Sequence, residues 1–166
     1  MGSYGRFKPQ IIWKAHAENK CKFFAWTLVH NKTLTADNLE RRGWPHHDVC
    51  VMCNGPLKTG CHLSLQCLFA QAVWNQVMSW ELFDVELPAP SDGSLQISSW
   101  REDASGRIPR DKRRAFNGTV IYVMWNIWKE CNRRIFDDRF QTAQQVAAKV
   151  REDILQYKRA RRIVCF

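Results

Sequence analysis

The stretch CVMCNGPLKTGCHLSLQC, which runs from Cys50 to Cys67, decides the fold of this chain. It carries the pattern C-x2-C-x8-H-x4-C, whose four potential metal ligands are Cys50, Cys53, His62 and Cys67. Zn²⁺ prefers thiolate and imidazole ligands, and four of them complete a tetrahedral shell without an open position. The pattern therefore predicts a structural zinc ion that supports folding and carries out no chemistry.

Other potential ligands flank this set. Cys61 is a rival for the fourth position, but it is adjacent to His62 and would struggle to share the same ion, so Cys67 is favoured. The motif His46-His47-Asp48 could indicate a second metal or an acid-base pair, although a solvated loop beside the zinc site explains it better. A zinc hydrolase needs an open metal position and a nearby general base, which the closed ligand set does not offer.

The composition is typical of a folded intracellular protein. Apolar residues make up 45% of the 166 residues and aromatic residues 12%, which is enough to bury a core. The number of cysteines is odd, and together with the C-x2-C motif this favours metal binding in a reducing compartment over disulfides. We see neither a secretory leader nor a stretch of about 18 apolar residues. We therefore expect no membrane association, and a location in the nucleus or cytoplasm.

Helical periodicity dominates the chain outside the ligand loop. Apolar residues spaced by three and four positions predict helices over 19–30, 35–43, 62–80 and 110–137, and from residue 142 onward. Asn19, Thr35 and Thr142 are suited to cap helix starts, and Gly43 is suited to end a helix. We find no strand-like alternation. The expected fold class is mainly α, with a small zinc-knuckle (Cys3His) helical domain plus a C-terminal helical hairpin.

Short motifs that surround the ligands occur between about residues 11 and 80: Ile12-Trp13-Lys14, Asn19 to Trp26, Leu34 to Asp37, Arg42-Gly43-Trp44, the two ligand pairs and Ala72-Val73-Trp74. They closely resemble the zinc-binding domain that follows reverse transcriptase in plant LINE-type, non-LTR retrotransposon polyproteins. The segment WNIWKECNRRIF, from Trp125 to Phe136, resembles the helical tail after that domain, except that Cys131 stands where family members often have Arg. The resemblance implies that Cys50, Cys53, His62 and Cys67 bind zinc, and that the parent polyprotein bound nucleic acid.

Four regions are expected along the chain: a flexible N-terminus at 1–10, the reverse-transcriptase-type zinc-binding domain at 11–85, a linker or irregular loop at 86–109 and a helical tail at 110–166. The third region is rich in Pro, Gly and Ser, a composition typical of irregular connections. The predicted helix over 110–137 is apolar on two faces, as in helices wedged between neighbours or protomers.

The sequence gives no indication of an enzyme. Reverse transcriptase needs an aromatic-x-Asp-Asp motif among several carboxylates that hold Mg²⁺. The nearest string, Phe136-Asp137-Asp138, lacks the intervening residue, and no carboxylate and histidine cluster of an endonuclease can be assembled. We therefore expect neither catalysis nor a small-molecule substrate.

The net charge of +9 is unevenly distributed, with −4 in residues 46–100, +5 before them and +8 after them. Such basic segments attract phosphates, so we expect binding of nucleic acid, either RNA or DNA, outside the acidic zinc segment. The candidate contacts are Lys20, Lys22, Lys32, Arg110, Lys112, Arg113, Arg114, Lys158, Arg159, Arg161 and Arg162. Five tryptophans could stack on bases, but their helical phase favours a place in the core: Trp13, Trp26, Trp74, Trp125 and Trp128.

The alternative function is that of a zinc-stabilised structural or protein-interaction module without nucleic-acid binding. In this alternative the helix over 110–137 meets a protein partner or a second copy of the chain. Salt separates the two possibilities, because phosphate binding weakens steeply with salt and an apolar interface does not.

Overall fold

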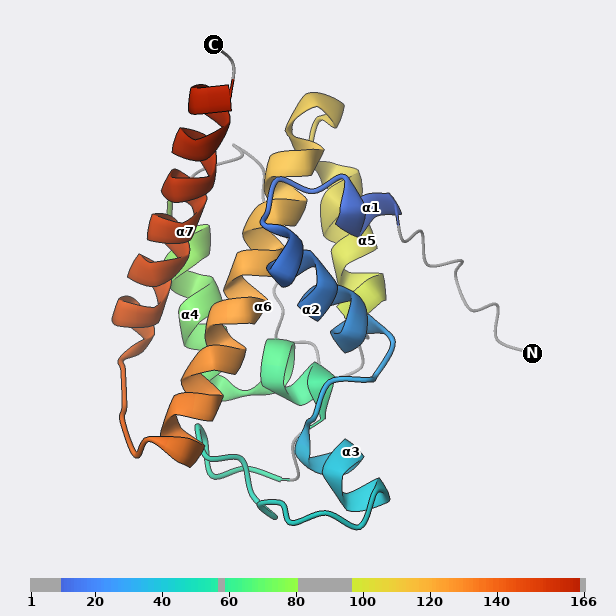
Figure 1. The fold of residues 1–166 in the computed structure, drawn as a ribbon, viewed down its shortest axis with the longest axis vertical. Coiled ribbons are helices and arrows are strands. Elements are labelled where there is room, and N and C mark those ends of the chain that lie inside the picture. Colours follow the sequence, from blue (N-terminus) through green and yellow to red (C-terminus); the bar gives the residue numbers. More distant parts are fainter. Residues whose placement is uncertain (1–9, 57–58, 81–96, 165–166) are drawn as a thin grey trace, which may run out of the picture.

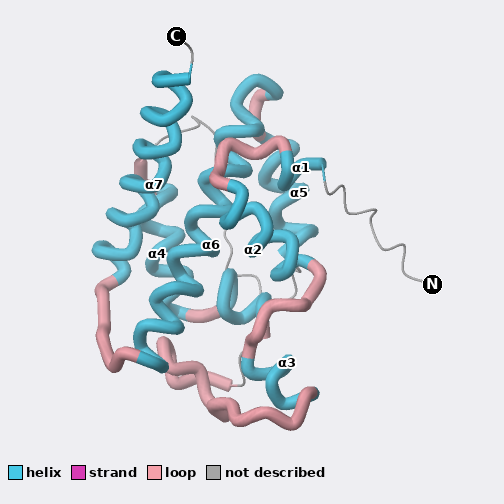
Figure 2. The backbone as a smooth tube through the Cα atoms, in the orientation of Figure 1, coloured by secondary structure: helices cyan, strands magenta, loops and turns pink. Residues whose placement is uncertain are grey.

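The computed structural model describes residues 10–56, 59–80 and 97–164. These residues form helices and loops without a strand, so the mainly α fold class is confirmed (Figure 2). The helices are α1 (Gln10–Trp13), α2 (Asn19–Val29), α3 (Ala36–Arg41), the π-helical turn η1 (His62–Gln66), α4 (Leu68–Met78), α5 (Ile97–Arg107), the 3-10 turn η2 (Arg110–Lys112), α6 (Arg113–Phe136) and α7 (Ala143–Val164). No described helix is long and apolar enough to cross a membrane.

Helix α6 lies at the centre of the fold, as its two apolar faces predict. It passes between α7 and α4 on one side and α1, α2 and α5 on the other (Figure 1). Val120, Ile121, Val123 and Ile127 are at most 1% exposed, because other helices of the same chain cover them. Helix α7 returns antiparallel to α6, which gives the expected C-terminal hairpin.

The zinc-binding region and the helical tail share one hydrophobic core. The ring of Phe24 in α2 lies 5.4 Å from that of Trp125 and 4.9 Å from that of Trp128, both in α6. The backbone before α2 approaches α6 even more closely, since a Cβ added to Gly118 would lie 2.2 Å from the His16 carbonyl oxygen. Only glycine permits this contact without a shift of the backbone.

The expected capping residues had different outcomes. Thr142 forms a reciprocal cap at the start of α7, because its Oγ1 accepts from the Gln145 N–H at 3.2 Å and its own N–H donates to Gln145 Oε1 at 2.9 Å. The prediction for Asn19 is wrong, since Asn19 is already helical and Glu18 occupies the capping position. The Glu18 N–H donates to the Tyr122 hydroxyl at 3.1 Å, which holds that residue outside the helix.

The other two predictions for helix ends hold. Thr35 precedes α3 as expected, with its hydroxyl donating to the carboxylate of Asp37. Gly43 follows the helix with a φ of +68°, the left-handed conformation that glycine adopts readily.

The expectation of an irregular connection over 86–109 is wrong for residues 97–107, which form α5. Trp100 and Ala104 of α5 and Ile108 just after it are buried and four residues apart, so one face of this helix is buried despite its polar composition. Trp100 packs edge-on against Trp74 of α4, with ring centroids 4.9 Å apart. Residues 86–96 and the N-terminal residues 1–9 lie outside the described residues.

Candidate metal centre

The first ligand pair lies in a tight loop before η1. The Cys50 carbonyl accepts from the Asn54 N–H at 2.8 Å, and the Cys50 N–H donates to the Gly55 carbonyl at 3.1 Å. Asn54 has a φ of 56°, which reverses the chain after Cys53. The Gly55 N–H lies 3.4 Å from the Cys53 thiol, and a Cβ on Gly55 would lie 3.1 Å from that sulfur. The loop is thus shaped around the Cys53 sulfur.

The second ligand pair bounds the π-helical turn η1. A regular α-helix would place residues 62 and 67 about 140° apart around its axis, so both could not face one ion. In η1 the Cys67 N–H instead donates to the His62 carbonyl at 2.7 Å, a five-residue step that widens the turn. The predicted continuous helix over 62–80 is therefore wrong at Cys67, which is extended between η1 and α4.

Trp74 supports this turn from α4. Its indole Nε1–H donates to the Ser64 carbonyl at 2.7 Å, and the side chain is 1% exposed. The sequence assigned Trp74 to the core but did not indicate this hydrogen bond. The rule that a buried indole needs an acceptor could have pointed to such a partner, although not to its identity.

The four ligand atoms converge to within 4.8 Å of one another. The sulfurs of Cys50 and Cys67 are 3.9 Å apart, and Cys53 Sγ lies 3.4 Å from His62 Nε2. Tetrahedral zinc, with Zn–S of about 2.3 Å and Zn–N of about 2.0 Å, requires about 3.8 Å between sulfurs and about 3.5 Å between sulfur and nitrogen. The predicted Cys3His set therefore fits a structural zinc ion.

Burial and pairing perturb the thiols of this site. Hydrogen bonding with Cys67 lowers the pKa of Cys50, and the same hydrogen bond, together with burial, raises the pKa of Cys67. Two buried sulfurs at this distance share one proton and resist a second negative charge. A divalent cation would offset that charge and hold all three thiolates, so the ligand set is suited to a buried metal.

The alternative ligands do not join the set. The Cys61 thiol is not among the converging ligand atoms, which confirms the preference for Cys67. His46 Nε2 lies 3.5 Å from Asp48 Oδ1, while His47 and Asp48 are exposed. Among the described residues no third ligand group meets them, and the interpretation as a solvated loop stays a prediction.

The segment that carries the ligands is similar to a known protein family. Residues 5–74 match the family described as zinc-binding in reverse transcriptase. All four ligands lie within this segment, which is under half of the chain and is similar to a zinc-binding domain associated with reverse transcriptase in retroelements. That domain is an accessory to the catalytic reverse transcriptase domain. Comparisons with curated proteins and with solved structures gave no significant match.

Four of the predicted cations converge outside the metal centre, around His16. Arg161, Arg114, Lys22 and Lys158 all lie close enough to His16 to lower its pKa, in addition to the larger effect of burial. We call these five residues the His16 cluster. They come from α2, α6, α7 and the link before α2, whose meeting point lies at the opposite end of the long axis from the Cys50–Cys53 loop (Figure 1).

Direct contacts join His16 to Arg114 and, through Tyr157, to Arg161. The His16 N–H donates to the Arg114 carbonyl at 3.0 Å. The His16 ring stacks on the Tyr157 ring with centroids 6.1 Å apart, and the Arg161 guanidinium lies 5.5 Å from the centroid of the Tyr157 ring. The Lys22 ammonium donates to the Trp13 carbonyl at 3.0 Å. The sequence contained the cations and Tyr157, but the convergence depends on tertiary packing.

The other predicted cations are placed differently. Lys20 pairs with Glu18 at 3.1 Å, and Arg113 donates through Nε to the Ile108 carbonyl at 3.0 Å. Three further candidates are exposed at scattered positions: Lys32, Arg110 and Arg159. Lys112 is half-buried. The side chain of Arg162 lies outside the described part of the chain.

The tryptophans divide into core and surface. Trp74 is buried, and three others are half-buried against the core, as their helical phase predicted: Trp26, Trp125 and Trp128. Trp13 differs, because its side chain is 45% exposed.

Glu130 forms a network that the sequence reasoning missed. Its carboxylate is 0% exposed and accepts from the Arg133 guanidinium, from Arg134 Nε at 2.8 Å and from the Gln141 N–H at 2.8 Å. The three- and four-residue spacing from Glu130 to the arginines was a usable indication. These two arginines stabilise the α6–α7 turn, since a buried carboxylate needs such partners.

Proposed function

We propose that this chain is a zinc-supported, non-catalytic module that binds nucleic acid through phosphates at the His16 cluster. The observation that carries the proposal is the convergence of Lys22, Arg114, Lys158 and Arg161. Among the ion pairs of the described residues, none neutralises these four side chains. Clustered cations bind a polyanion with release of its counterions, so such a surface suits a phosphate backbone.

The zinc centre supports this function by holding the scaffold. It packs η1 against α6, whose first turn carries Arg114. Residues 46–100, which contain the zinc ligands, have a net charge of −4, so the phosphate contacts are assigned to the flanking helices. We also infer that the chain originates from a plant LINE-type, non-LTR polyprotein. This inference rests on the motifs between residues 11 and 80 and is more specific than the matched family description.

A salt titration with a charge variant tests the proposal. We expect the triple variant Lys22→Gln, Arg114→Gln, Arg161→Gln to bind nucleic acid more weakly and with a shallower dependence of log K on log salt. Removing one cation that neutralises a phosphate lowers that slope by about 0.7 on a single strand, so the three substitutions together lower it by about 2. Fluorescence anisotropy of the zinc-loaded protein with a labelled 12-mer RNA measures both quantities.

A matched control removes the same charge elsewhere. The variant Arg41→Gln, Arg107→Gln, Arg139→Gln changes exposed arginines outside the cluster, two of which pair with Asp37 and Asp103. We expect this control to change the slope by less than half as much. Equal effects of the two triple variants would mean that only net charge matters and would contradict a site at the His16 cluster.

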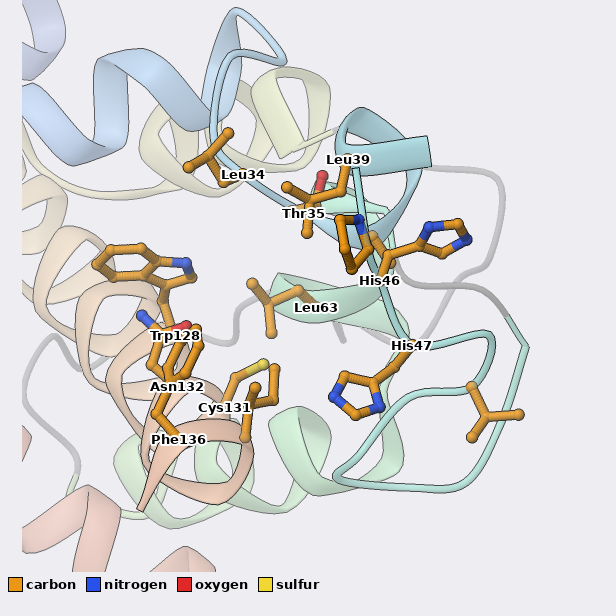
Figure 3. Close-up of a pocket in the computed structure, with 14 residues that line it drawn as sticks. Leu34, Thr35, Leu39, His46, His47, Leu63, Trp128, Cys131, Asn132 and Phe136 are labelled. Atoms are coloured by element: carbon orange, nitrogen blue, oxygen red, sulfur yellow. The ribbon is translucent and has the colours of Figure 1, made fainter. Parts of the chain in front are cut away.

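A pocket of about 510 Å³ favours protein binding as a second candidate function (Figure 3). It lies between α3, the loop before Cys50 and the end of α6, and apolar side chains dominate its lining. Leu34 and Val49 are each 50% exposed and Phe136 is 78% exposed. Exposed apolar patches of this kind mark interaction sites. Association through this pocket would persist in high salt, whereas phosphate binding would be lost.

A further inference from the structure

An exposed tryptophan lies beside the His16 cluster. Trp13 is the last residue of α1, and its side chain is 45% exposed, while Trp74 and Trp100 are at most 1% exposed. The Lys22 ammonium is fixed 3.0 Å from the Trp13 carbonyl, so one cation of the cluster is held against this residue. An exposed indole on a residue whose backbone carbonyl binds a cation of the cluster differs from the buried tryptophans of this chain.

Exposed aromatic side chains elsewhere are outside the His16 cluster or are already stacked. Trp44 is 49% exposed with the Arg42 guanidinium 5.4 Å from its ring, but it follows α3 and lies at the other end of the molecule from α1 (Figure 1). Phe140 is 66% exposed, but the Arg134 guanidinium lies 5.2 Å from its ring and that arginine already pairs with Glu130. Phe23 is 60% exposed and stacks on Trp26, with centroids 6.2 Å apart. Trp13 is therefore the residue through which the cluster could contact an aromatic ligand group.

We propose that the His16 cluster binds single-stranded nucleic acid in preference to a duplex, with an unpaired base stacked on Trp13 and the adjacent phosphates on Lys22, Arg114 and Arg161. This inference rests on the proposed function and adds its substrate class. Proteins that bind single strands combine a basic surface with aromatic rings on which bases stack, whereas the bases of a duplex are already stacked on each other. Stacking tolerates any base, so the site selects strand form and not sequence.

The test compares strand forms in Trp13 variants of the full, zinc-loaded chain. The probes are a labelled 12-mer RNA without secondary structure, a DNA 12-mer of the same sequence and the corresponding RNA duplex. We expect Trp13→Ala to weaken single-strand binding about tenfold, the loss of one stacked base, while duplex binding changes less than twofold. Trp13→Phe, which keeps a ring, should recover most of the loss.

A control variant and a folding check make the result decisive. Phe140→Ala removes a ring that is even more exposed than that of Trp13 but lies away from the cluster, and it should leave all affinities unchanged. Circular dichroism melting confirms that each variant is folded. If the triple cation variant weakens binding but Trp13→Ala and Trp13→Phe both leave the single-strand to duplex ratio unchanged, the stacking role is wrong and phosphate binding stands. If the cation variant has no effect, the proposed function fails as well.

Discussion

The metal centre and the His16 cluster are built in opposite ways. The four metal ligands lie in one eighteen-residue stretch, inside the net acidic segment 46–100, and Cys50 and Cys67 are fully buried. The His16 cluster draws positive residues from α2, from the start of α6 and from α7, and it leaves most of them at the surface. A site built from one local segment is determined by spacing, whereas a site built from distant segments is determined by the core between them.

The largest effect is expected at the metal centre. Replacing Cys50 or His62 by Ala should abolish zinc binding and unfold at least residues 44–80, because structural zinc contributes roughly 10 kcal/mol to the folding of small zinc domains. Metal analysis and hydrogen exchange measure the two consequences. Cys61→Ala serves as the control, since its thiol lies outside the ligand set. One zinc per chain with unchanged melting in Cys50→Ala would refute the assignment.

An intermediate effect is expected where the core positions the His16 cluster. In Gly118→Ala the new Cβ meets the His16 carbonyl oxygen at 2.2 Å, so the segment before α2 must move away from α6. Overpacking of this kind costs about 1 to 3 kcal/mol, and we expect nucleic-acid binding to weaken too, while zinc content stays at one per chain. Urea unfolding measures the stability.

Gly106→Ala is the matched comparison, because nothing lies within 4 Å of its added Cβ. In α5 it should stabilise the fold by about 0.5 to 1 kcal/mol, since alanine loses less backbone entropy than glycine. If both variants were equally stable, the close contact between His16 and α6 would not constrain the cluster.

The smallest effect is a pH dependence at His16. Burial and then Arg161, Arg114, Lys22 and Lys158 lower its pKa from 6.5. His16 is thus neutral at pH 7, and its contribution to stability is complete above about pH 6.5 and is lost as the pH falls through the lowered folded value. A bound phosphate offsets the surrounding positive charge and favours protonation, so binding should take up a proton and strengthen at lower pH.

We expect the affinity for a single strand to rise a few-fold between pH 7.5 and pH 6.5 through His16 alone. The variant His16→Gln keeps a polar side chain and isolates this contribution from other histidines. Anisotropy titrations at the two pH values, with zinc content checked at each, measure it. An identical pH dependence in His16→Gln would exclude His16 as the titrating group.

The sequence predicted the metal centre because ligand type and spacing are local properties. It also predicted α2, α3, α6 and α7. In these helices the apolar residues recur over several turns, or residues such as Gly43 and Thr142 mark an end of the helix. It failed at Cys67, since periodicity cannot distinguish one long helix from a π turn followed by a second helix. It failed for α5 because only Trp100 and Ala104, with Ile108 just beyond the helix, mark its buried apolar face within a polar segment. The His16 cluster required the packing of α6 against α2 and α7.

The hydrogen bond from Glu18 to Tyr122 spans 104 residues, and it has a consequence for the order of folding during synthesis. The thiols of the metal centre leave the ribosome long before α6 and α7, which cover the apolar residues around them. Contacts between residues so distant in sequence form late, after the long loop between them has closed. The apolar residues of η1 that pack against α6 therefore stay uncovered in the nascent chain until α6 is made.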